Sequence, residues 1–250
     1  MQWSKVKDLS IVLLLVVNLL LGRLTAAAFR LKGDRVNTHL MCNMFSNTTF
    51  LGLPLLTALV PEGVFCIPIY SLTCNVVLYT VGVGLYTARD RAPAKSGGAG
   101  LVKRLLNPVT ATTLLGLVLV LLNIRLPDLV LRIVDSIGST SSPLSMIYIG
   151  AILTDMDIAA ALRRTSILLS SPLRLVLMPL AAFLVLRAAG VSPLVTETLT
   201  ILFALPCQVS ISMLARTGGS DYVYVTEYVL LSTLLSILTI PLVTTLMALL

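Results

Sequence analysis

Two stretches of this 250-residue chain place proline beside hydrogen-bonding side chains within otherwise apolar sequence. They contain Asn47, Thr48, Gly52 and Pro54 in the first stretch, and Pro206, Gln208 and Ser210 in the second. A proline inside a helix removes one backbone donor and clashes with the preceding turn, at a cost of about 3 kcal/mol. Backbone groups freed in this way are costly in lipid. Each stretch therefore predicts a broken helix whose polar groups face protein, water or a bound solute.

Other polar residues also fall inside apolar segments. Asn75 needs a hydrogen-bond partner in a membrane, and either a neighbouring helix or a solute would supply it. The charged residues in such segments are Arg23, Arg132, Asp135, Arg174 and Glu227. Charges inside a span mark functional sites by default, yet a side chain within a few residues of a span end reaches water by snorkelling. Both interpretations stay open, and Glu227 is the candidate for proton coupling.

The composition indicates which class of protein positions these residues. Hydrophobic residues make up 57% of the chain and charged residues 12%, and the mean hydropathy is +0.98. Soluble domains carry about 25% charged residues, whereas a helix that crosses a bilayer needs about 20 apolar residues. The sequence therefore predicts an all-α polytopic membrane protein without a sizeable soluble domain.

The sequence contains little material for catalysis. One histidine and four cysteines without a CxxC pair form no metal-binding pattern, and Walker, HExxH and GxSxG motifs are absent. A net charge of +7 would suit nucleic acid in a soluble protein, but in a membrane protein it reflects basic cytoplasmic loops. We expect no enzymatic activity, no metal or cofactor, and no nucleic-acid partner.

Hydropathy, proline, glycine and charge together predict eight transmembrane helices. Their expected ranges are 9–29, 37–59, 64–87, 106–123, 127–153, 166–189, 192–215 and 223–250. The stretch 88–105 has the composition of a linker. It divides the chain into residues 1–87, a partial first repeat of three helices, and residues 106–250, a second repeat of five helices.

The last three helices resemble the first three when Gly63 is superposed on Gly219. This superposition sets the 37–59 helix over the 192–215 helix, with Pro54 about one turn from the position that matches Pro206. Trios that lie five helices apart cross the bilayer in opposite senses, so the sequence predicts an inverted repeat. Broken helices in corresponding positions of two repeats indicate a transporter binding site.

The distribution of basic residues predicts how the chain is oriented. With both termini outside, the inner loops hold eleven lysines and arginines and the outer segments hold four. The inner group is Arg30, Lys32, Arg35, Arg89, Arg91, Lys95, Lys103, Arg104, Arg163, Arg164 and Arg216. Because basic loops stay on the cytoplasmic side, we expect a multi-pass protein of the cell membrane with both termini outside.

The order of these motifs resembles the auxin efflux carrier family of membrane transporters. The resemblance is carried by Asn47, Gly52 and Pro54, by Asn107-Pro108, by Pro143 to Gly150, by Leu205-Pro206 through Gly219 to Asp221, and by Leu231 to Pro241. It implies two inverted five-helix repeats with crossing broken helices, and this chain lacks the first two helices of that arrangement. It also implies a scaffold with a dimer contact, so a homodimer is an expected partner.

These observations predict a secondary transporter that works by alternating access within the lipid bilayer, and the resemblance implies that it exports small organic anions, auxin-like or dicarboxylic. Half-helix N-termini near the breaks present positive dipole ends to a carboxylate, and Asn47, Gln208 and Asn75 donate hydrogen bonds. Two alternatives remain. One is a truncated, non-transporting fragment or partner-dependent subunit, and the other is a passive channel.

Overall fold

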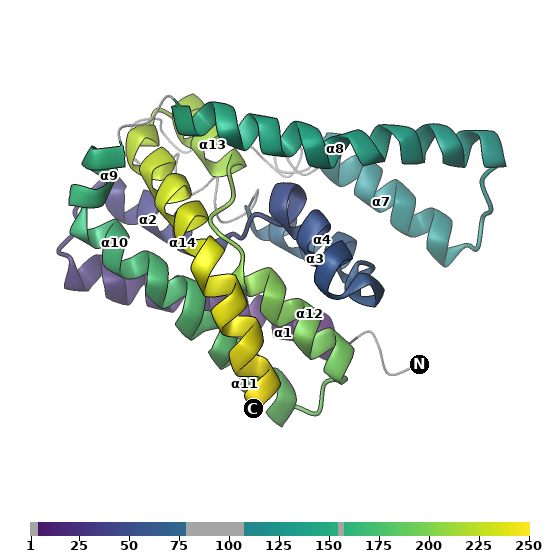
Figure 1. Cartoon of the computed structure of the whole chain (residues 1–250), viewed down its shortest axis with the longest axis horizontal. Helices are drawn as coiled ribbons and strands as arrows, with labels where there is room; N and C mark the ends of the chain where they lie inside the picture. Colours follow the sequence, from purple (N-terminus) through teal and green to yellow (C-terminus); the bar gives the residue numbers. More distant parts are fainter. Residues whose placement is uncertain (1–4, 79–107, 155–157) are drawn as a thin grey trace, which may run out of the picture.

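The computed structural model describes residues 5–78, 108–154 and 158–250. The first range contains α1 (Lys5–Ala28), α2 (Asp34–Met44), η1 (Thr48–Gly52), α3 (Leu53–Leu59), η2 (Pro61–Gly63) and α4 (Cys66–Val77). The others contain α7 (Pro108–Leu121), α8 (Asp128–Thr154), α9 (Ile158–Arg163), α10 (Thr165–Pro172), η4 (Leu173–Leu177), α11 (Met178–Ala188), α12 (Pro193–Ala204), α13 (Ser210–Gly218) and α14 (Tyr222–Leu249). Across these ranges the regular structure is helical, as predicted (Figure 1).

Among the residues that the structure describes, two helical segments are long and apolar enough to cross a membrane by themselves. They are Thr165–Ala188, which joins α10, η4 and α11, and Tyr222–Leu249, which is α14. Shorter apolar helices occupy Leu14–Ala28, Phe50–Leu59, Cys66–Val77 and Pro193–Ala204. These lengths agree with an all-α membrane protein, and the count of eight spans stays a prediction. The predicted linker at 88–105 lies outside the described residues.

Both predicted broken helices are interrupted. The first is helical to Met44, extended at Phe45 (φ −112°, ψ 128°), and helical again from Thr48. The second is helical to Ala204, extended at Leu205 (φ −65°, ψ 148°), and resumes in α13 at Ser210.

The first interruption does not lie at Pro54, where we expected it. Pro54 lies in the first turn of α3, where its missing N–H needs no partner. The preceding turn is π-helical, and the backbone N–H groups of Leu51 and Gly52 both donate to the carbonyl of Asn47, at 3.2 and 3.1 Å. The chain therefore breaks one helical stretch earlier, at residues 45–47.

The two interruptions cross each other as an isolated antiparallel bridge between Ser46 and Cys207. Asn47 N donates to Pro206 O at 2.8 Å, and Gln208 N donates to Phe45 O at 3.1 Å. Each extended segment thus satisfies backbone groups that the other frees, which removes much of the cost of breaking a helix in lipid.

The bridge also changes the register of the proposed repeat. Ser46 and Cys207 differ by 161 in residue number, whereas Gly63 and Gly219 differ by 156. The two glycines serve different purposes. Gly219 has a left-handed φ of 73° that ends α13, while Gly63 lies where an added Cβ would come within 2.1 Å of Thr198 Oγ1.

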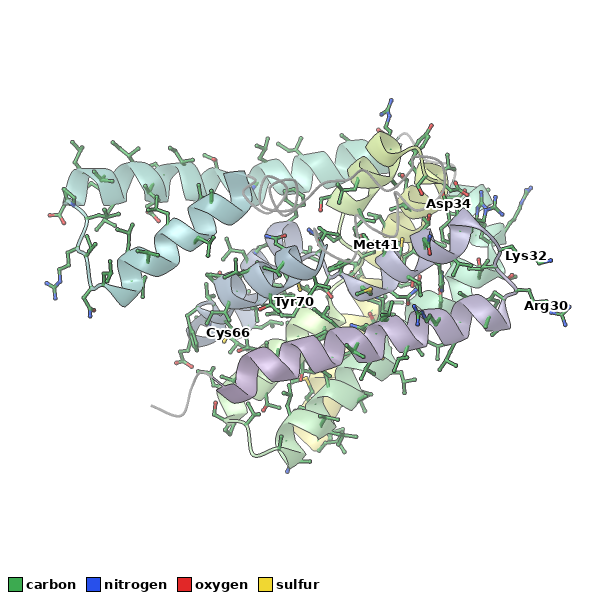
Figure 2. All side chains as sticks on the ribbon, turned by 180° about the vertical axis from the view of Figure 1, so that it is seen from behind. Arg30, Lys32, Asp34, Met41, Cys66 and Tyr70 are labelled. Carbon is green, nitrogen blue, oxygen red and sulfur yellow. The ribbon has the colours of Figure 1, made fainter. Side chains whose placement is uncertain are left out.

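Loops that we predicted on one side of the membrane lie at one end of the helix bundle. Arg35 and Asp221 form a 2.9 Å ion pair, and Ser220 Oγ donates to Asp34 Oδ2 at 2.6 Å. Figure 2 shows Arg30, Lys32 and Asp34 at this end, with Cys66 toward the other. The alternation of the helices across a membrane stays a prediction.

The α7 and α8 pair extends away from the remaining helices (Figure 1). Its large apolar side chains are exposed, among them Leu129, Ile137 and Ile147. Ser139 and Thr140 donate to backbone carbonyls of their own helix, at 2.9 and 2.6 Å, so these hydroxyls are satisfied without another helix. An exposed apolar surface of this kind suits contact with lipid.

Candidate functional site

Asn47 lies at the centre of the crossing, fully buried. Its Oδ1 atom accepts a hydrogen bond from Phe50 N at 3.3 Å, which caps η1. Its Nδ2 atom is buried and has no hydrogen-bond partner. A buried amide donor without a partner costs about 1–3 kcal/mol, so this group is suited to donate to a bound solute.

Ser210 provides a second unpartnered group on the other broken helix. It is the first residue of α13, and its Oγ atom is buried without a hydrogen-bond partner. Ser212, two residues later, instead donates to Val209 O at 2.8 Å. α13 and the η1–α3 stretch both begin at the crossing. The positive ends of their helix dipoles favour negative charge there.

Gln208 follows the bridge directly. Its backbone N–H is committed to Phe45 O, whereas its side chain is half-buried. Each amide follows a bridge residue directly, Asn47 after Ser46 and Gln208 after Cys207. The two amides that we selected from the sequence therefore occupy equivalent places on the two segments. Pro206 belongs to the same segment and contributes its carbonyl to Asn47 N.

The remaining sequence candidates from the first stretch lie around η1. Thr48 is buried, and its Oγ1 lies 3.4 Å from Ser71 Oγ of α4. Asn75 is one turn further along α4, on the helix face that carries Ser71. A Cβ on Gly52 would lie 3.1 Å from Leu205 Cδ1, so glycine permits the close approach of the two segments. Pro54 lies further along, in α3.

Arg174 is a residue whose role the sequence left open and which the structure places at the crossing. It lies in η4 and is only 1% exposed. Its guanidinium contacts both helix interruptions. Nε donates to Asn43 O at 2.9 Å, Nη1 to Leu205 O at 3.0 Å, and Nη2 to Phe45 O and Ser46 Oγ, both at 3.0 Å. Of the two interpretations left open for this residue, snorkelling does not apply, because the polar contacts of Arg174 lie inside the protein.

A buried polar network leads from the crossing toward the end of the bundle that carries Arg35. His39 Nε2 lies 2.9 Å from Thr25 Oγ1, and His39 Nδ1 lies 2.9 Å from the Tyr224 hydroxyl. Asn43 Nδ2 donates to His39 O at 2.8 Å, and Asn43 Oδ1 accepts from the Tyr228 hydroxyl at 3.2 Å. These contacts tie α1, α2 and α14 together.

Glu227, the proton-coupling candidate, does not contact the crossing residues. It forms an ion pair with Arg164, whose guanidinium also lies 5.8 Å from the centre of the Tyr224 ring. This pair belongs to the end of the bundle where Arg35 contacts Asp221. A role for Glu227 in proton coupling stays a prediction.

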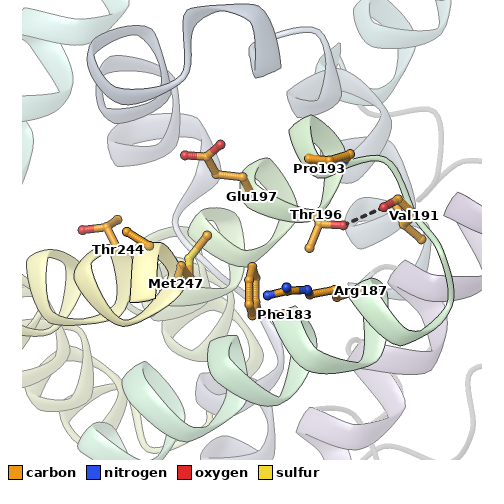
Figure 3. Close-up of a pocket in the computed structure, with 9 residues that line it drawn as sticks. Phe183, Arg187, Val191, Pro193, Thr196, Glu197, Thr244 and Met247 are labelled. Atoms are coloured by element: carbon orange, nitrogen blue, oxygen red, sulfur yellow. Dashed lines mark hydrogen bonds between the residues drawn. The ribbon is translucent and has the colours of Figure 1, made fainter. Parts of the chain in front are cut away.

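A cavity of about 440 Å³ lies where α11, α12 and α14 meet (Figure 3). Its walls are formed by Phe183, Arg187, Val191, Pro193, Thr196, Glu197, Thr244, Met247 and Ala248. It includes none of the candidate residues that the sequence suggested. In the described ranges, no group of three histidine, cysteine or acidic side chains is arranged to hold a metal ion.

Comparison with known proteins places this chain in a family. A search of curated proteins found no match. A family model described as membrane transport protein matches residues 2–244, nearly the whole chain. This result confirms the resemblance to auxin efflux carriers that the motif order indicated. The chain therefore belongs to the membrane transport protein family.

Proposed function

We propose that this protein is a secondary transporter that exports a small organic anion across the cell membrane by alternating access. It has an inverted-repeat fold with eight membrane spans and both termini outside. Membership of the family supports transport, and the crossing of two interrupted helices supports a solute site at the centre of the membrane.

One observation carries the position of the site. Asn47 Nδ2 and Ser210 Oγ are buried, unpartnered groups at the starts of the two half-helices that leave the crossing. A carboxylate bound there accepts hydrogen bonds from both groups and lies on two positive dipole ends. We also assign Thr48, Gln208 and Asn75 to this site; Gly52 permits the close approach of Leu205, and the carbonyl of Pro206 accepts from Asn47 N.

The charge at the crossing favours a solute with one negative charge. The four hydrogen bonds of Arg174 go to protein oxygens, so its guanidinium has no bidentate face left for a second carboxylate. Two helix N-termini supply roughly half a positive charge each. The site therefore balances a monocarboxylate better than a dicarboxylate.

Membrane potential is sufficient to drive export of such a solute. Moving one negative charge out of a negative interior gains about 2.3 kcal/mol per 100 mV. This corresponds to a concentration ratio of roughly 50-fold at that potential. Export therefore needs no second solute as an energy source, and saturation of flux with substrate separates this carrier from a passive channel.

Ser210→Ala tests the site with a matched control on the same helix. This change removes a hydroxyl without a partner in the protein, whereas Ser212→Ala removes one that already bonds to Val209 O. A hydrogen bond to a charged group contributes about 1.5–3 kcal/mol, so we expect KM to rise about tenfold or more in Ser210→Ala. KM should change less than about twofold in Ser212→Ala, whose lost bond is to its own helix.

The measurement is uptake of labelled monocarboxylates into membrane vesicles at fixed potential, with the amount of inserted protein measured for each variant. Equal KM values for the two variants and the unsubstituted protein would remove Ser210 from the site.

A further inference from the structure

Arg174 occupies the middle of a membrane-spanning segment. It belongs to the π-helical turn between α10 and α11, and Thr165–Ala188 is long and apolar enough to span a membrane. A π-turn in an α-helix frequently marks a functional position. The side chain leaves this turn and reaches both interrupted helices, from Asn43 to Leu205.

Four oxygen atoms accept hydrogen bonds from the guanidinium of Arg174. They are the carbonyls of Asn43, Phe45 and Leu205 and the hydroxyl of Ser46. The carbonyls lie where α2 and α12 end, so they form the negative ends of two helix dipoles. In transporters with discontinuous helices, carbonyls at such half-helix C-termini are the groups that coordinate a coupling Na⁺ or H⁺.

No acidic side chain in the described part of the chain forms an ion pair with Arg174; the ion pairs there join Arg35 to Asp221 and Arg164 to Glu227. A buried, unbalanced charge costs several kcal/mol. Two helix C-termini carry roughly half a negative charge each, and together they balance one guanidinium. The carbonyl ends of α2 and α12 and the guanidinium of Arg174 therefore balance each other's charge without any bound ion.

We propose that Arg174 is a tethered cation that occupies the place of a coupling ion at the crossing. An arginine stays protonated in proteins, so this site neither binds and releases an inorganic cation nor exchanges a proton during transport. The anion then moves without Na⁺ or K⁺, and its own charge crosses the membrane. This inference rests on the proposed transport function and adds the mode of ion coupling at the same site.

Flux measurements in the unsubstituted protein give the first test. Uptake of a labelled monocarboxylate is measured at fixed membrane potential, with Na⁺ replaced by choline. We expect the two rates to agree within about twofold, since no cation site at the crossing is open. A flux that requires Na⁺ would overturn the proposal.

Substitution of Arg174 gives the second test. Arg174→Ala opens a space lined by three carbonyls and one hydroxyl, so its flux in choline should fall about tenfold or more. Added guanidinium should restore flux, because it supplies the same N–H donors, whereas tetramethylammonium, which has none, should not. Arg132→Ala is the matched control, since Arg132 also lies in a predicted span but is exposed on α8.

Thermal unfolding separates this inference from the transport function. Guanidinium should raise the melting temperature of Arg174→Ala but not that of the unsubstituted protein, because it binds only the opened site. If the unsubstituted protein carries no solute, the transport function fails and the melting temperatures still test the cation site. If Arg174→Ala inserts and responds to guanidinium in neither assay, the tethered cation is wrong. Where that variant does not fold, loss of flux in Arg174→Lys to the level of empty vesicles overturns the proposal, because lysine retains the charge.

Discussion

At the scale of residues, the crossing separates two kinds of polar group. Arg174 binds the carbonyls at the C-terminal ends of α2 and α12. The unpartnered groups of Asn47 and Ser210 lie at the N-terminal ends of η1 and α13. The negative dipole ends thus have a permanent cation, while the positive ends are free for a solute. This asymmetry is the physical basis for assigning an anion to the site.

Asn47 and Ser210 could be selected from the sequence because the signal lies within a few neighbouring residues. An amide or hydroxyl in an apolar span needs a partner, and a flanking proline marks where the helix is interrupted. The role of Arg174 could not be decided from the sequence, because a charged residue near a span end and one in the middle of a span are told apart only by the span boundaries. Its position eight residues after the predicted start at 166 was the available signal. The partners of His39 lie 14 and 185 residues away along the chain, so no local pattern contains them.

At the scale of elements, hydropathy located the helix ends that lie in the described residues to within a few residues. The first interruption was misplaced because proline at the start of a helix and proline in its interior look alike in sequence. The first helix is interrupted where Asn47 pairs with the backbone of Pro206. This is a contact between distant segments, which no local pattern contains. The register of the proposed repeat shifted by five residues for the same reason.

The contact between η2 and α12 depends on one glycine. A Cβ at Gly63 would lie 2.1 Å from Thr198 Oγ1 and 3.1 Å from Thr198 Cβ. Overpacking of this kind costs about 1–3 kcal/mol, so Gly63→Ala should lower the unfolding temperature measured in detergent. Gly116→Ala is the control, because an added Cβ there meets no atom within 4 Å.

Thr198→Ala tests the cause of this effect. It removes the hydroxyl that the new Cβ would strike, so Gly63→Ala combined with Thr198→Ala should be more stable than Gly63→Ala with Thr198 intact. An unchanged melting temperature in Gly63→Ala would show that η2 and α12 do not pack as described.

At the scale of the whole molecule, loops sort to two ends of the bundle. Arg35 contacts Asp221 at one end, and Gly63 approaches Thr198 toward the other. The alternation of the helices across the membrane stays a prediction, which rests on hydropathy and on the basic residues of each loop. The apolar helices on either side of the crossing, Phe50–Leu59 and Pro193–Ala204, are too short to span a membrane alone, so the interrupted helices need each other at the crossing to place their backbone in a membrane.

The predicted orientation can be measured with introduced cysteines. Lys32 and Glu62 are exposed in different loops, and the four native cysteines are buried. In intact cells, a membrane-impermeant thiol reagent should label Glu62→Cys and leave Lys32→Cys unlabelled until the cells are opened. The reverse pattern would invert the orientation, and labelling of both in intact cells would contradict the alternation of the helices.

The measurement that tests the central claim most directly is saturable, potential-driven uptake of a labelled monocarboxylate by the unsubstituted protein and by Asn47→Asp. Aspartate retains an oxygen that can cap η1 through Phe50 N, but it replaces the free donor with a negative charge. The account predicts saturable uptake that Asn47→Asp lowers about tenfold or more, with equal amounts of inserted protein. No uptake by the unsubstituted protein, or equal KM and maximal rate in both proteins, would contradict an anion site at the crossing.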